Sequence, residues 1–479
     1  MASHDPDRPN VLLILSDDQG PWALGCAGND DIRTPALDAL AASGVRLSRF
    51  FCASPVCSPA RASLFTGEIP SQHGVHDWIS RGHVGDDGVD FLAGRRLFTD
   101  DLHDAGYRLG LIGKWHLGAN DRPRPGFVRW LAHESGGGPY LDTVLYDGGE
   151  RVEAPGYLTD VLTDEACAFL SGEAERQEPF YLSLHYTAPH TPWKGQHPEA
   201  FEALYDGCAF DSCPQEPPHP WQPVGPDGAP VGGEPDVRAA LTGYFAAVSA
   251  MDAGIGRVLS RLAELGLTES TLVVFTSDNG FNCGHHGIWG KGNGTFPQNV
   301  YDSSVMVPAI VSQPGRVPGG RVCEALLSAY DLRPTLLEHL GLPAATAGAR
   351  PGRSFADVLG GSPGEDRPRV VVFDEYGPVR MIRTEAWKYV HRHPYGPHEL
   401  YDLVADPGER RNLADAPEAA SARAGLAGEL DAWFARYVDP AADGRGLPVS
   451  GSGQTAPLRP GSGLGAFEAA PFPTVPRYG

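Results

Sequence analysis

The sequence predicts an α/β protein with a mostly parallel sheet sandwiched by helices, and three observations lead to this fold class. Short apolar runs rich in strand-forming residues alternate with segments of helical periodicity over the first two thirds of the chain. Polar residues directly follow several of these runs, as they do at the carboxyl edge of an open α/β sheet. The chain has 479 residues, of which 41% are hydrophobic and 20% are charged, so a large core can form.

The expected elements follow from these patterns in order. The first strand is residues 10–15, and Thr34 can cap the helix after it, with Pro35 in its first turn and Gly44 as its stop. Further strands are expected at 108–113, 179–185 and 271–276, and further helices at 99–105, 157–170 and 236–265. The last helix is the clearest, because its apolar residues recur at three- and four-residue spacing: Leu241, Phe245, Val248, Met251, Ile255, Val258 and Leu262.

The composition divides the chain into three parts. Residues 1–365 form the main α/β domain, in which the Pro/Gly-rich insertion 204–235 is a candidate lid. Residues 366–438 contain short, closely spaced strands at 369–373, 380–384 and 387–391 and a terminal helix at 417–437, which predicts a smaller antiparallel-sheet-plus-helix subdomain. Residues 439–479 are rich in Gly, Pro and Ser and predict an extended tail, which could cross to a neighbouring subunit of a homo-oligomer.

Charge and hydropathy exclude several classes of protein. The formal net charge of −22 argues against a nucleic-acid partner, which needs a basic face. No apolar run approaches the ~18 residues of a membrane span. Residues 1–9 are polar and lack the apolar stretch of a secretory signal, so we expect a cytoplasmic protein. The eight cysteines show neither zinc spacing nor a disulfide framework; we expect buried thiols, with Cys57 set apart and Cys208 and Cys213 left open.

Two of the predicted strands end in hard oxygen ligands. Asp17 and Asp18 follow the first strand, and Asp278 and Asn279 follow the strand at 271–276. Three carboxylates and an amide suit Ca²⁺ or Mg²⁺, and crowded carboxylates require a neutralising cation. Adjacent aspartates on a strand would point to opposite faces, so both can reach one ion only if the chain has left the strand there.

Other polar groups follow the remaining strands. Lys114 and His116 come after the strand at 108–113, and His190 comes after the strand at 179–185. Each could be a helix cap or a solvated loop residue. Because four separate strands deliver polar groups to one edge, we expect a functional site there.

Cys57 stands at the expected start of a helix. Pro59 suits a first helical turn and Ser58 can cap it, so the helix dipole would favour negative charge at Cys57. The residues leave two alternatives open: a thiolate nucleophile of low pKa, or a buried structural cysteine.

Motifs along most of the chain resemble one enzyme family. Cys57-Ser58-Pro59-Ala60-Arg61, followed by Ala62-Ser63-Leu64-Phe65-Thr66-Gly67, resembles the signature of the type I sulfatases, which belong to the alkaline phosphatase-like superfamily. Further motifs match in the order of that family: Pro9-Asn10-Val11 through Asp17-Asp18, Gly113-Lys114-Trp115-His116-Leu117-Gly118, Pro189-His190-x-Pro192, Thr276-Ser277-Asp278-Asn279-Gly280, His286-Gly287-x-Trp289-Gly290-Lys291, and Glu399-Leu400-Tyr401-Asp402-Leu403 with Asp406-Pro407 and Asn412-Leu413. So many matches in order are highly specific.

The resemblance implies a covalent mechanism. A separate generating enzyme would oxidise Cys57 to formylglycine (3-oxoalanine), whose hydrate attacks sulfur with one hydroxyl. The second hydroxyl would then lose its proton and expel sulfate, a step that a serine ester cannot perform. The resemblance assigns the metal ligands and the catalytic groups as follows: residue 57, Asp17, Asp18, Asp278 and Asn279 hold Ca²⁺, with Mg²⁺ as the alternative; Arg61 and Lys114 stabilise the hydrate; His116 takes the proton; His190 and Lys291 bind sulfate and assist the leaving group.

Several other residues are weaker candidates. His76 and Trp78 could line a sugar subsite, with Trp78 stacking on a ring, and His286 could touch substrate or orient Lys291. Trp193 also lies near a catalytic segment. Structural or surface roles are expected for His73, His285, His391, His393 and His398.

The sequence therefore predicts a sulfuric ester hydrolase, with a small sulfated saccharide as the expected substrate. One alternative is a phosphodiesterase or phosphonate monoester hydrolase of the same superfamily, because sulfate and phosphate are both tetrahedral. The segment 399–413 and the Trp115-His116 and His286-Gly287-x-Trp289 motifs favour a sulfatase. A second alternative is an inactive module that binds anions or sugars.

Overall fold

A ten-stranded mixed sheet forms the centre of the molecule. The computed structural model describes residues 8–223, 236–343, 349–363, 371–459 and 464–468. The strand order is β14-β2-β13-β9-β1-β8-β4-β5-β6-β7, and the five strands from β9 to β5 run parallel. These strands are β1 (Asn10–Ser16), β2 (Val45–Leu47), β4 (Arg108–Gly113), β5 (Phe127–His133), β6 (Leu141–Asp147), β7 (Glu150–Tyr157), β8 (Phe180–His185), β9 (Thr271–Ser277), β13 (Ala309–Ser312) and β14 (Arg321–Cys323).

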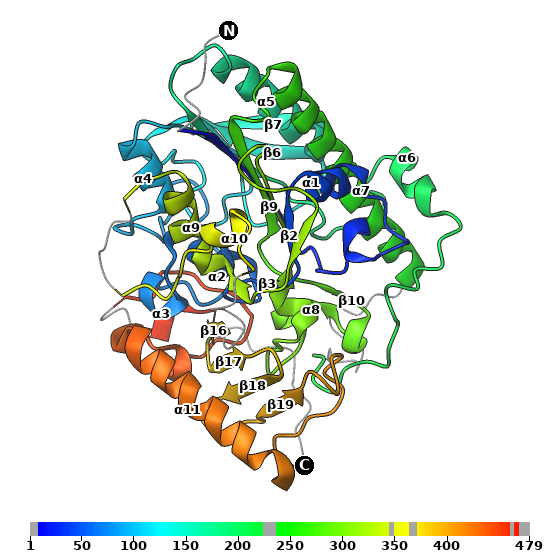
Figure 1. Ribbon diagram of the computed structural model, residues 1–479, viewed down its shortest axis with the longest axis vertical. Helices are drawn as coiled ribbons and strands as arrows, with labels where there is room; N and C mark the ends of the chain where they lie inside the picture. Colours follow the sequence, from blue (N-terminus) through cyan, green and yellow to red (C-terminus); the bar gives the residue numbers. More distant parts are fainter. Residues whose placement is uncertain (1–7, 224–235, 344–348, 364–370, 460–463, 469–479) are drawn as a thin grey trace.

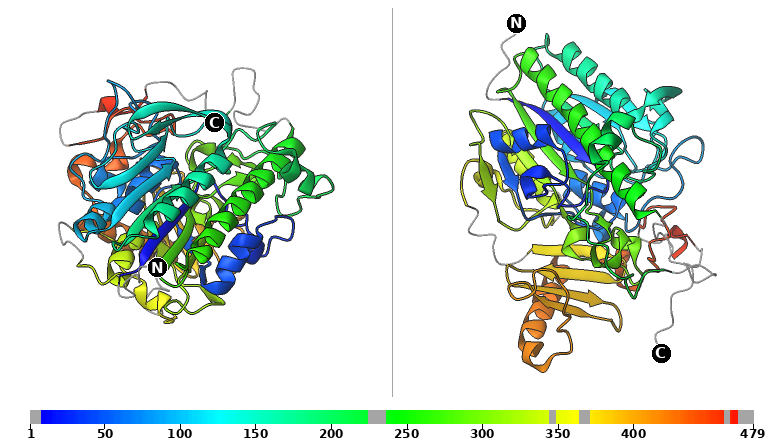
Figure 2. Two further views of the ribbon diagram at one scale, coloured as in Figure 1. Left: turned by 90° about the horizontal axis from the view of Figure 1, so that it is seen from above. Right: turned by 90° about the vertical axis from the view of Figure 1, so that its right-hand side faces the viewer.

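Helices cover both faces of this sheet (Figures 1 and 2). Successive side chains of a buried strand point to opposite sides, so both faces of the sheet are apolar and need a covering layer. Leu12 and Ile14 of β1 join the core formed with helices on one face, and Val11, Leu13 and Leu15 join the core on the other. The first face carries α1 (Pro35–Ser43), α5 (Leu158–Glu173) and α7 (Val237–Glu264), and the second carries α2 (Cys57–Thr66), α4 (Phe98–Asp104), α9 (Leu332–His339) and α10 (Ala356–Leu359).

The predicted fold class is confirmed, and most predicted elements agree with the structure to within three residues at each end. β4 has the bounds expected from the sequence, and α7 differs by one residue at each end. The sequence analysis did not anticipate β5, β6 and β7, the last two of which extend the sheet in antiparallel fashion. Their side chains alternate between buried and exposed only in part, so they lack the apolar runs of the central strands. Within the ranges described, no helix is long and apolar enough to cross a membrane.

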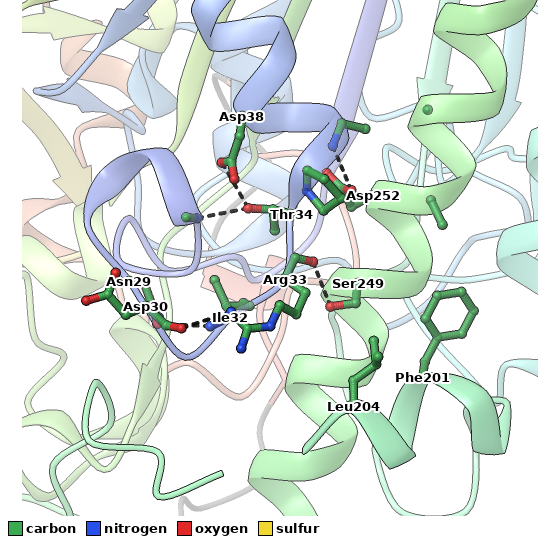
Figure 3. Close-up of a pocket in the computed structure, with 15 residues that line it drawn as sticks. Asn29, Asp30, Ile32, Arg33, Thr34, Asp38, Phe201, Leu204, Ser249 and Asp252 are labelled. Carbon is green, nitrogen blue, oxygen red and sulfur yellow. Dashed lines mark hydrogen bonds between the residues drawn. The ribbon is translucent and has the colours of Figure 1, made fainter. Parts of the chain in front are cut away.

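The helix caps expected at Thr34 and at Ser58 are both wrong. Thr34 occupies the N-cap of α1 without capping it; its Oγ1 accepts from Gly25 N and bonds Asp38. Instead, Asp252 of α7, which is labelled in Figure 3, accepts from Ala36 N at 3.0 Å. It also accepts from Leu37 N at 2.8 Å. A carboxylate from a neighbouring helix thus satisfies the free N–H groups of α1 and complements its dipole.

We expect Asp252→Ala to destabilise the protein without touching the chemistry. The substitution leaves the N–H groups of Ala36 and Leu37 unpaired, and losing such an acceptor costs about 1–3 kcal/mol in the free energy of unfolding. Urea denaturation measures this change. Glu264→Ala, an exposed position on the same helix, is the matched control and should stay within about 0.5 kcal/mol. Equal stability of the two variants would contradict the cross-helix cap.

A smaller sheet packs against the main domain at the end opposite the N-terminus (Figure 1). It runs β16 (Val371–Tyr376), β17 (Val379–Arg383), β18 (Trp387–Arg392) and β19 (Glu399–Asp402), all antiparallel, and α11 (Ala420–Tyr437) packs on β17 and β18. Lys388 of β18 lies 2.9 Å from Asp302 and 2.6 Å from Glu409 and is fully buried. Asp302 begins α8 (Asp302–Val305), so this ion cluster joins the small sheet to the main domain.

The described part of the C-terminal segment folds back onto its own chain. Gln454 is fully buried, and its carboxamide accepts from His76 N at 2.7 Å and donates to Gly74 O at 2.8 Å. These bonds lie within one molecule, whereas the sequence analysis left open a crossing to a neighbouring subunit. Residues 469–479 lie outside the described part of the chain.

Candidate active site

The ends of four strands bring the predicted polar groups together. Asp17 and Asp18 follow β1, Asp278 and Asn279 follow β9, and Lys114 and His116 follow β4. His190 lies beyond β8, and Cys57 is the first residue of α2. All of these side chains except His190 are buried, with an exposed fraction of 3% or less. The site is therefore built on the carboxyl edge of the parallel sheet.

Three carboxylates converge at the centre of the site. One oxygen from each of Asp17, Asp18 and Asp278 lies within 4.8 Å of the others. Both adjacent aspartates can contribute because β1 ends at Ser16 and Asp18 takes a left-handed backbone conformation, with φ of 63°. The chain has left the strand, as a shared ion requires.

Three cations neutralise these carboxylates. Arg61 Nε lies 2.9 Å from Asp278, Lys114 pairs with Asp17 and Lys291 pairs with Asp18. Burial works against the ionised forms, but Lys291 and His190 hold the pKa of Asp18 below its usual range, and Arg61 and Lys114 do the same for Asp278. For Asp17, burial and the charge of Asp278 prevail over Lys114 and raise the pKa.

The donor set fits a hard divalent cation. Asn279 Oδ1 is buried and has no hydrogen-bond partner, while its Nδ2 donates to Asp18 at 2.8 Å. A buried carbonyl oxygen without a partner costs free energy unless a ligand satisfies it. Three carboxylate oxygens and this amide oxygen are ligands that Ca²⁺ and Mg²⁺ prefer. The sequence-predicted metal ligands are thus side by side, although nothing in the donor set separates the two ions.

Cys57 lies at the inner end of this cluster. Its Sγ is 2.7 Å from Lys291 Nζ and 3.5 Å from Asp17 Oδ1. Burial raises the pKa of the thiol to about 12, although Lys114 and Lys291 act in the opposite direction. Burial therefore works against a thiolate at this position, the first of the two alternatives. Ser58, expected as a cap, instead donates to His116 O at 3.0 Å and accepts from Ile79 N.

His116 is held in one orientation beside this cluster. Its Nε2 lies 3.1 Å from the carbonyl oxygen of Ile79, and because a carbonyl can only accept, Nε2 carries the hydrogen. Nδ1 is then an acceptor, and it is buried without a partner. Burial and the charge of Lys114 keep the pKa of His116 well below its usual value, which favours the neutral ring with a free lone pair on Nδ1.

A cavity of about 450 Å³ opens onto Cys57. We call it the catalytic cavity. Of the predicted residues, Cys57, Trp78, His116, His190 and Lys291 line it. The sequence analysis missed the rest of its lining: Val56, Ile79, Ser80, His83, Ser135, Gly136, Gly137 and Asn293.

The glycines at 136 and 137 are needed for close packing on the histidines. A Cβ on Gly136 would lie 2.2 Å from the His116 ring, and one on Gly137 would lie 2.8 Å from the His190 ring. Only the Gly-rich run at 136–138 could have drawn attention to this loop in the sequence.

Two of the predicted substrate-binding residues lie elsewhere. His76 is fully buried and does not line the catalytic cavity; its backbone N–H bonds Gln454. His286 stacks on Tyr301 with ring centroids 3.9 Å apart and also lies outside the lining. Trp193 packs in an apolar cluster with Tyr244 and Phe281 and does not line the catalytic cavity, although it is close in sequence to His190.

Trp78 does face the catalytic cavity, and the C-terminal segment holds it. Its indole Nε1 donates to Gly451 O at 2.9 Å, and its backbone carbonyl accepts from Gln454 N at 2.7 Å. His73, expected to be a structural residue, bonds Ser63 at 3.0 Å and is fully buried.

A larger cavity, of about 790 Å³, lies away from this chemistry, between the start of α1 and α7 (Figure 3). Several of its polar groups are already paired: Asp252 caps α1, Thr34 bonds Asp38, and Ser249 donates to Arg33 O. Volume alone therefore does not identify the functional site, and we assign the chemistry to the smaller cavity.

Buried oxygen ligands at the strand ends, beside a residue at a helix N-terminus and two lysines, suit a hydrolase that uses a divalent cation. Comparison with known proteins gives the family. The protein-family model described as Sulfatase matches residues 9–342. A second family model, described as N-sulphoglucosamine sulphohydrolase, C-terminal, matches residues 284–435. The chain belongs to the sulfatase family and is a sulfuric ester hydrolase.

Curated relatives and solved structures agree with this family. An N-acetylglucosamine-6-O-sulfatase of Bacteroides thetaiotaomicron is 26% identical, covering 90% of this chain and 87% of the relative. An ulvan-active sulfatase of Formosa agariphila is 30% identical over 89% of this chain and 80% of the relative. A structure solved with its substrate D-glucosamine-2-N,6-O-disulfate has a TM-score of 0.77 at 23% identity, over 92% of this chain and 99% of that one, and supports the fold.

Proposed function

We propose that this enzyme hydrolyses sulfate esters of carbohydrates, with residue 57 in its formylglycine form and a divalent cation, Ca²⁺ or Mg²⁺, on the neighbouring carboxylates. The observation that carries the proposal is the position of Cys57. It begins α2 at the inner end of the catalytic cavity, 2.7 Å from Lys291 and 3.5 Å from Asp17. The hydrated aldehyde would supply the nucleophilic hydroxyl, and the cation would lower its pKa and bind a sulfate oxygen.

The chain's own residues account for the remaining steps. Lys291 lines the cavity as a buried cation whose pKa stays well above its usual value, because the charge of Asp18 works against the effect of burial. Together with His190 it can hold the sulfate oxygens as negative charge develops. Lys114 and Arg61 fix the carboxylates, and the free Nδ1 of His116, which lines the cavity, is a candidate proton acceptor.

The carbohydrate part of the proposal has two supports. Several relatives are named for sulfated sugars, among them N-acetylglucosamine-6-O-sulfatase and N-acetylgalactosamine-6-sulfatase. The catalytic cavity also presents Trp78 beside hydroxyl and imidazole groups, and an indole face with polar neighbours suits a sugar ring. A choline-sulfatase of Rhizobium meliloti is 26% identical over 86% of this chain and 83% of the relative, so the family members matched here also include a non-carbohydrate enzyme.

A phosphonate monoester hydrolase is the second candidate. The solved enzyme of that name from Agrobacterium radiobacter has a TM-score of 0.67 at 25% identity, over 90% of this chain and 96% of that one. Its similarity over nearly the whole chain shows that this architecture also serves phosphorus chemistry, and Lys291 and His190 would bind either tetrahedral anion.

Turnover measurements separate these candidates. We expect the chain, co-expressed with a formylglycine-generating enzyme, to hydrolyse 4-nitrophenyl sulfate and N-acetylglucosamine 6-sulfate at least about 100-fold faster, by kcat/KM, than phenylphosphonate esters, a difference of about 2.7 kcal/mol. Mass spectrometry of the peptide containing residue 57 measures the aldehyde. A preference for the phosphonate would establish the second candidate, and full activity with an intact thiol would exclude the formylglycine mechanism.

A further inference from the structure

The catalytic cavity does not end at the residues around Cys57. A second cavity, of about 590 Å³, begins at His83 and Ser135, which line both. The chain also runs directly from one into the other, because Ser80 lines the first and Arg81 the second. We call this second space the side cavity. A ligand in the catalytic cavity can therefore extend into it.

The wall of the side cavity is organised before any ligand arrives. Arg122 donates to Gly85 O at 2.7 Å and to Gly88 O at 3.1 Å, and Gly85 N donates to Asp121 at 2.8 Å. Val89 N donates to Gly82 O at 2.9 Å and closes the base of the loop 82–89. These bonds limit the ordering cost of binding, which a mobile loop would add.

The side cavity has one cation, and the C-terminal segment has already neutralised it. The Arg81 guanidinium donates to both carboxylate oxygens of Glu468, at 2.7 and 3.2 Å. Ser80 Oγ donates to the same carboxylate at 3.0 Å. Glu468 thus occupies the position on Arg81 that an acidic ligand would need. A bidentate pair of this kind is the strongest geometry for a guanidinium and a carboxylate.

The other charged residues of the described lining are negative; Arg122, which donates to the carbonyl oxygens of Gly85 and Gly88, is not among them. Asp87 and Glu134 line the side cavity, and no further cation joins them among the described lining residues. His83 adds no positive charge, because burial and the charge of Lys114 lower its pKa. Carboxylates accept hydrogen bonds from sugar hydroxyls but repel sulfate and uronate groups. The charge of the side cavity thus differs from that of the catalytic cavity, which is lined by the cation Lys291.

We infer that the side cavity is a second saccharide subsite, which binds an uncharged sugar unit linked to the sulfated one. Thr455 supplies a hydroxyl to the same wall, so the C-terminal segment contributes to the subsite both directly and through Glu468. The inference rests on the proposed carbohydrate sulfatase function and narrows its substrate to oligosaccharides in which a neutral unit neighbours the sulfated residue.

A comparison of three substrates tests this subsite. The first is N-acetylglucosamine 6-sulfate, and the others are disaccharides that link the same sulfated sugar to a neutral hexose or to a hexuronate. We expect kcat/KM for the neutral disaccharide to exceed that for the monosaccharide by about tenfold, equivalent to about 1.4 kcal/mol. The hexuronate should give no gain over the monosaccharide, because Asp87 and Glu134 repel its carboxylate.

Charge-neutral variants locate the effect. Asp87→Asn combined with Glu134→Gln should raise kcat/KM for the hexuronate disaccharide at least about threefold and leave the monosaccharide rate unchanged. Asp86→Asn, on the same exposed loop but outside the cavity lining, is the matched control and should change neither.

The possible failures are distinguishable. If the monosaccharide is hydrolysed and neither disaccharide is better, or the hexuronate is preferred, the subsite inference is wrong and the sulfatase function stands. If 4-nitrophenyl sulfate is hydrolysed but no saccharide is, the carbohydrate assignment fails and the subsite with it. If no sulfate ester is hydrolysed despite an aldehyde at residue 57, the proposed function itself is overturned.

Discussion

Cys57→Ser is expected to fold like the parent and to lose repeated turnover, with kcat lower by about 10³-fold or more, the scale seen when a covalent nucleophile is removed. The serine hydroxyl can occupy the same position at the start of α2, between Lys291 and Asp17, so the structure offers no reason for unfolding. It would not be converted to the aldehyde by a cysteine-specific generating enzyme. Its sulfate ester would also lack the second hydroxyl that expels sulfate. A single burst of product without further cycles, measured by stopped-flow with 4-nitrophenyl sulfate, is the expected result.

Cys26→Ser provides the matched control for this experiment. Cys26 is a half-buried free thiol in the short 3-10 helix Gly25–Ala27 before α1, and it does not line the catalytic cavity. That variant should keep the parental kcat and melting temperature. Steady cycling of Cys57→Ser at the parental rate would show that residue 57 is not a covalent nucleophile.

Asp278→Asn is expected to lower kcat/KM by at least about 10²-fold, because it disturbs both the cation site and the guanidinium beside it. Asp278 Oδ2 holds Arg61 Nε at 2.9 Å, and Oδ1 accepts from Asn279 N at 2.8 Å. The amide removes one of three negative charges that balance Arg61, Lys114 and Lys291. The remaining carboxylates should therefore bind a divalent cation more weakly. Isothermal titration with Ca²⁺ and with Mg²⁺, and activity at several concentrations of each, measure the effect.

Asp302→Asn distinguishes loss of the site from loss of the fold. Asp302 is also a buried carboxylate, paired with Lys388 and Arg383, but it joins the small sheet to the main domain and does not line the catalytic cavity. Its substitution should lower the melting temperature and leave Ca²⁺ affinity and kcat/KM within about threefold of the parent. Parental metal affinity and activity in Asp278→Asn would contradict the proposed ligand set.

The fold and the centre of the site were largely accessible from the sequence. β1, β8 and β9 are buried along their whole length, and β4 is buried except at its first residue, so each contains an apolar run rather than an alternating pattern. Residues that directly follow such strands share one edge of the sheet. The spacing along the chain therefore predicted that Asp17, Lys114 and Asp278 would meet without any knowledge of their distances.

The failures have physical causes as well. Ser58 and Thr34 have the side chains of helix caps, but their hydroxyls find other partners once distant segments pack against them. His76 and Trp78 are two residues apart in the same segment, yet one is buried under the C-terminal segment and the other faces the cavity. Side-chain direction in an irregular loop follows no periodicity, so the sequence could not separate them.

Local pattern was sufficient to define the strand ends, the donor chemistry of the cation site and the special position of Cys57, because each depends on residues close together in the chain. Which groups surround the substrate depended on tertiary packing. The catalytic cavity is lined by segments that are far apart in the chain, among them His83 and the glycines at 136 and 137. Trp78 is bonded to Gly451 and Gln454, which are several hundred residues away in the sequence. Such contacts are chosen by the shape of the assembled core and leave no regular spacing in the sequence.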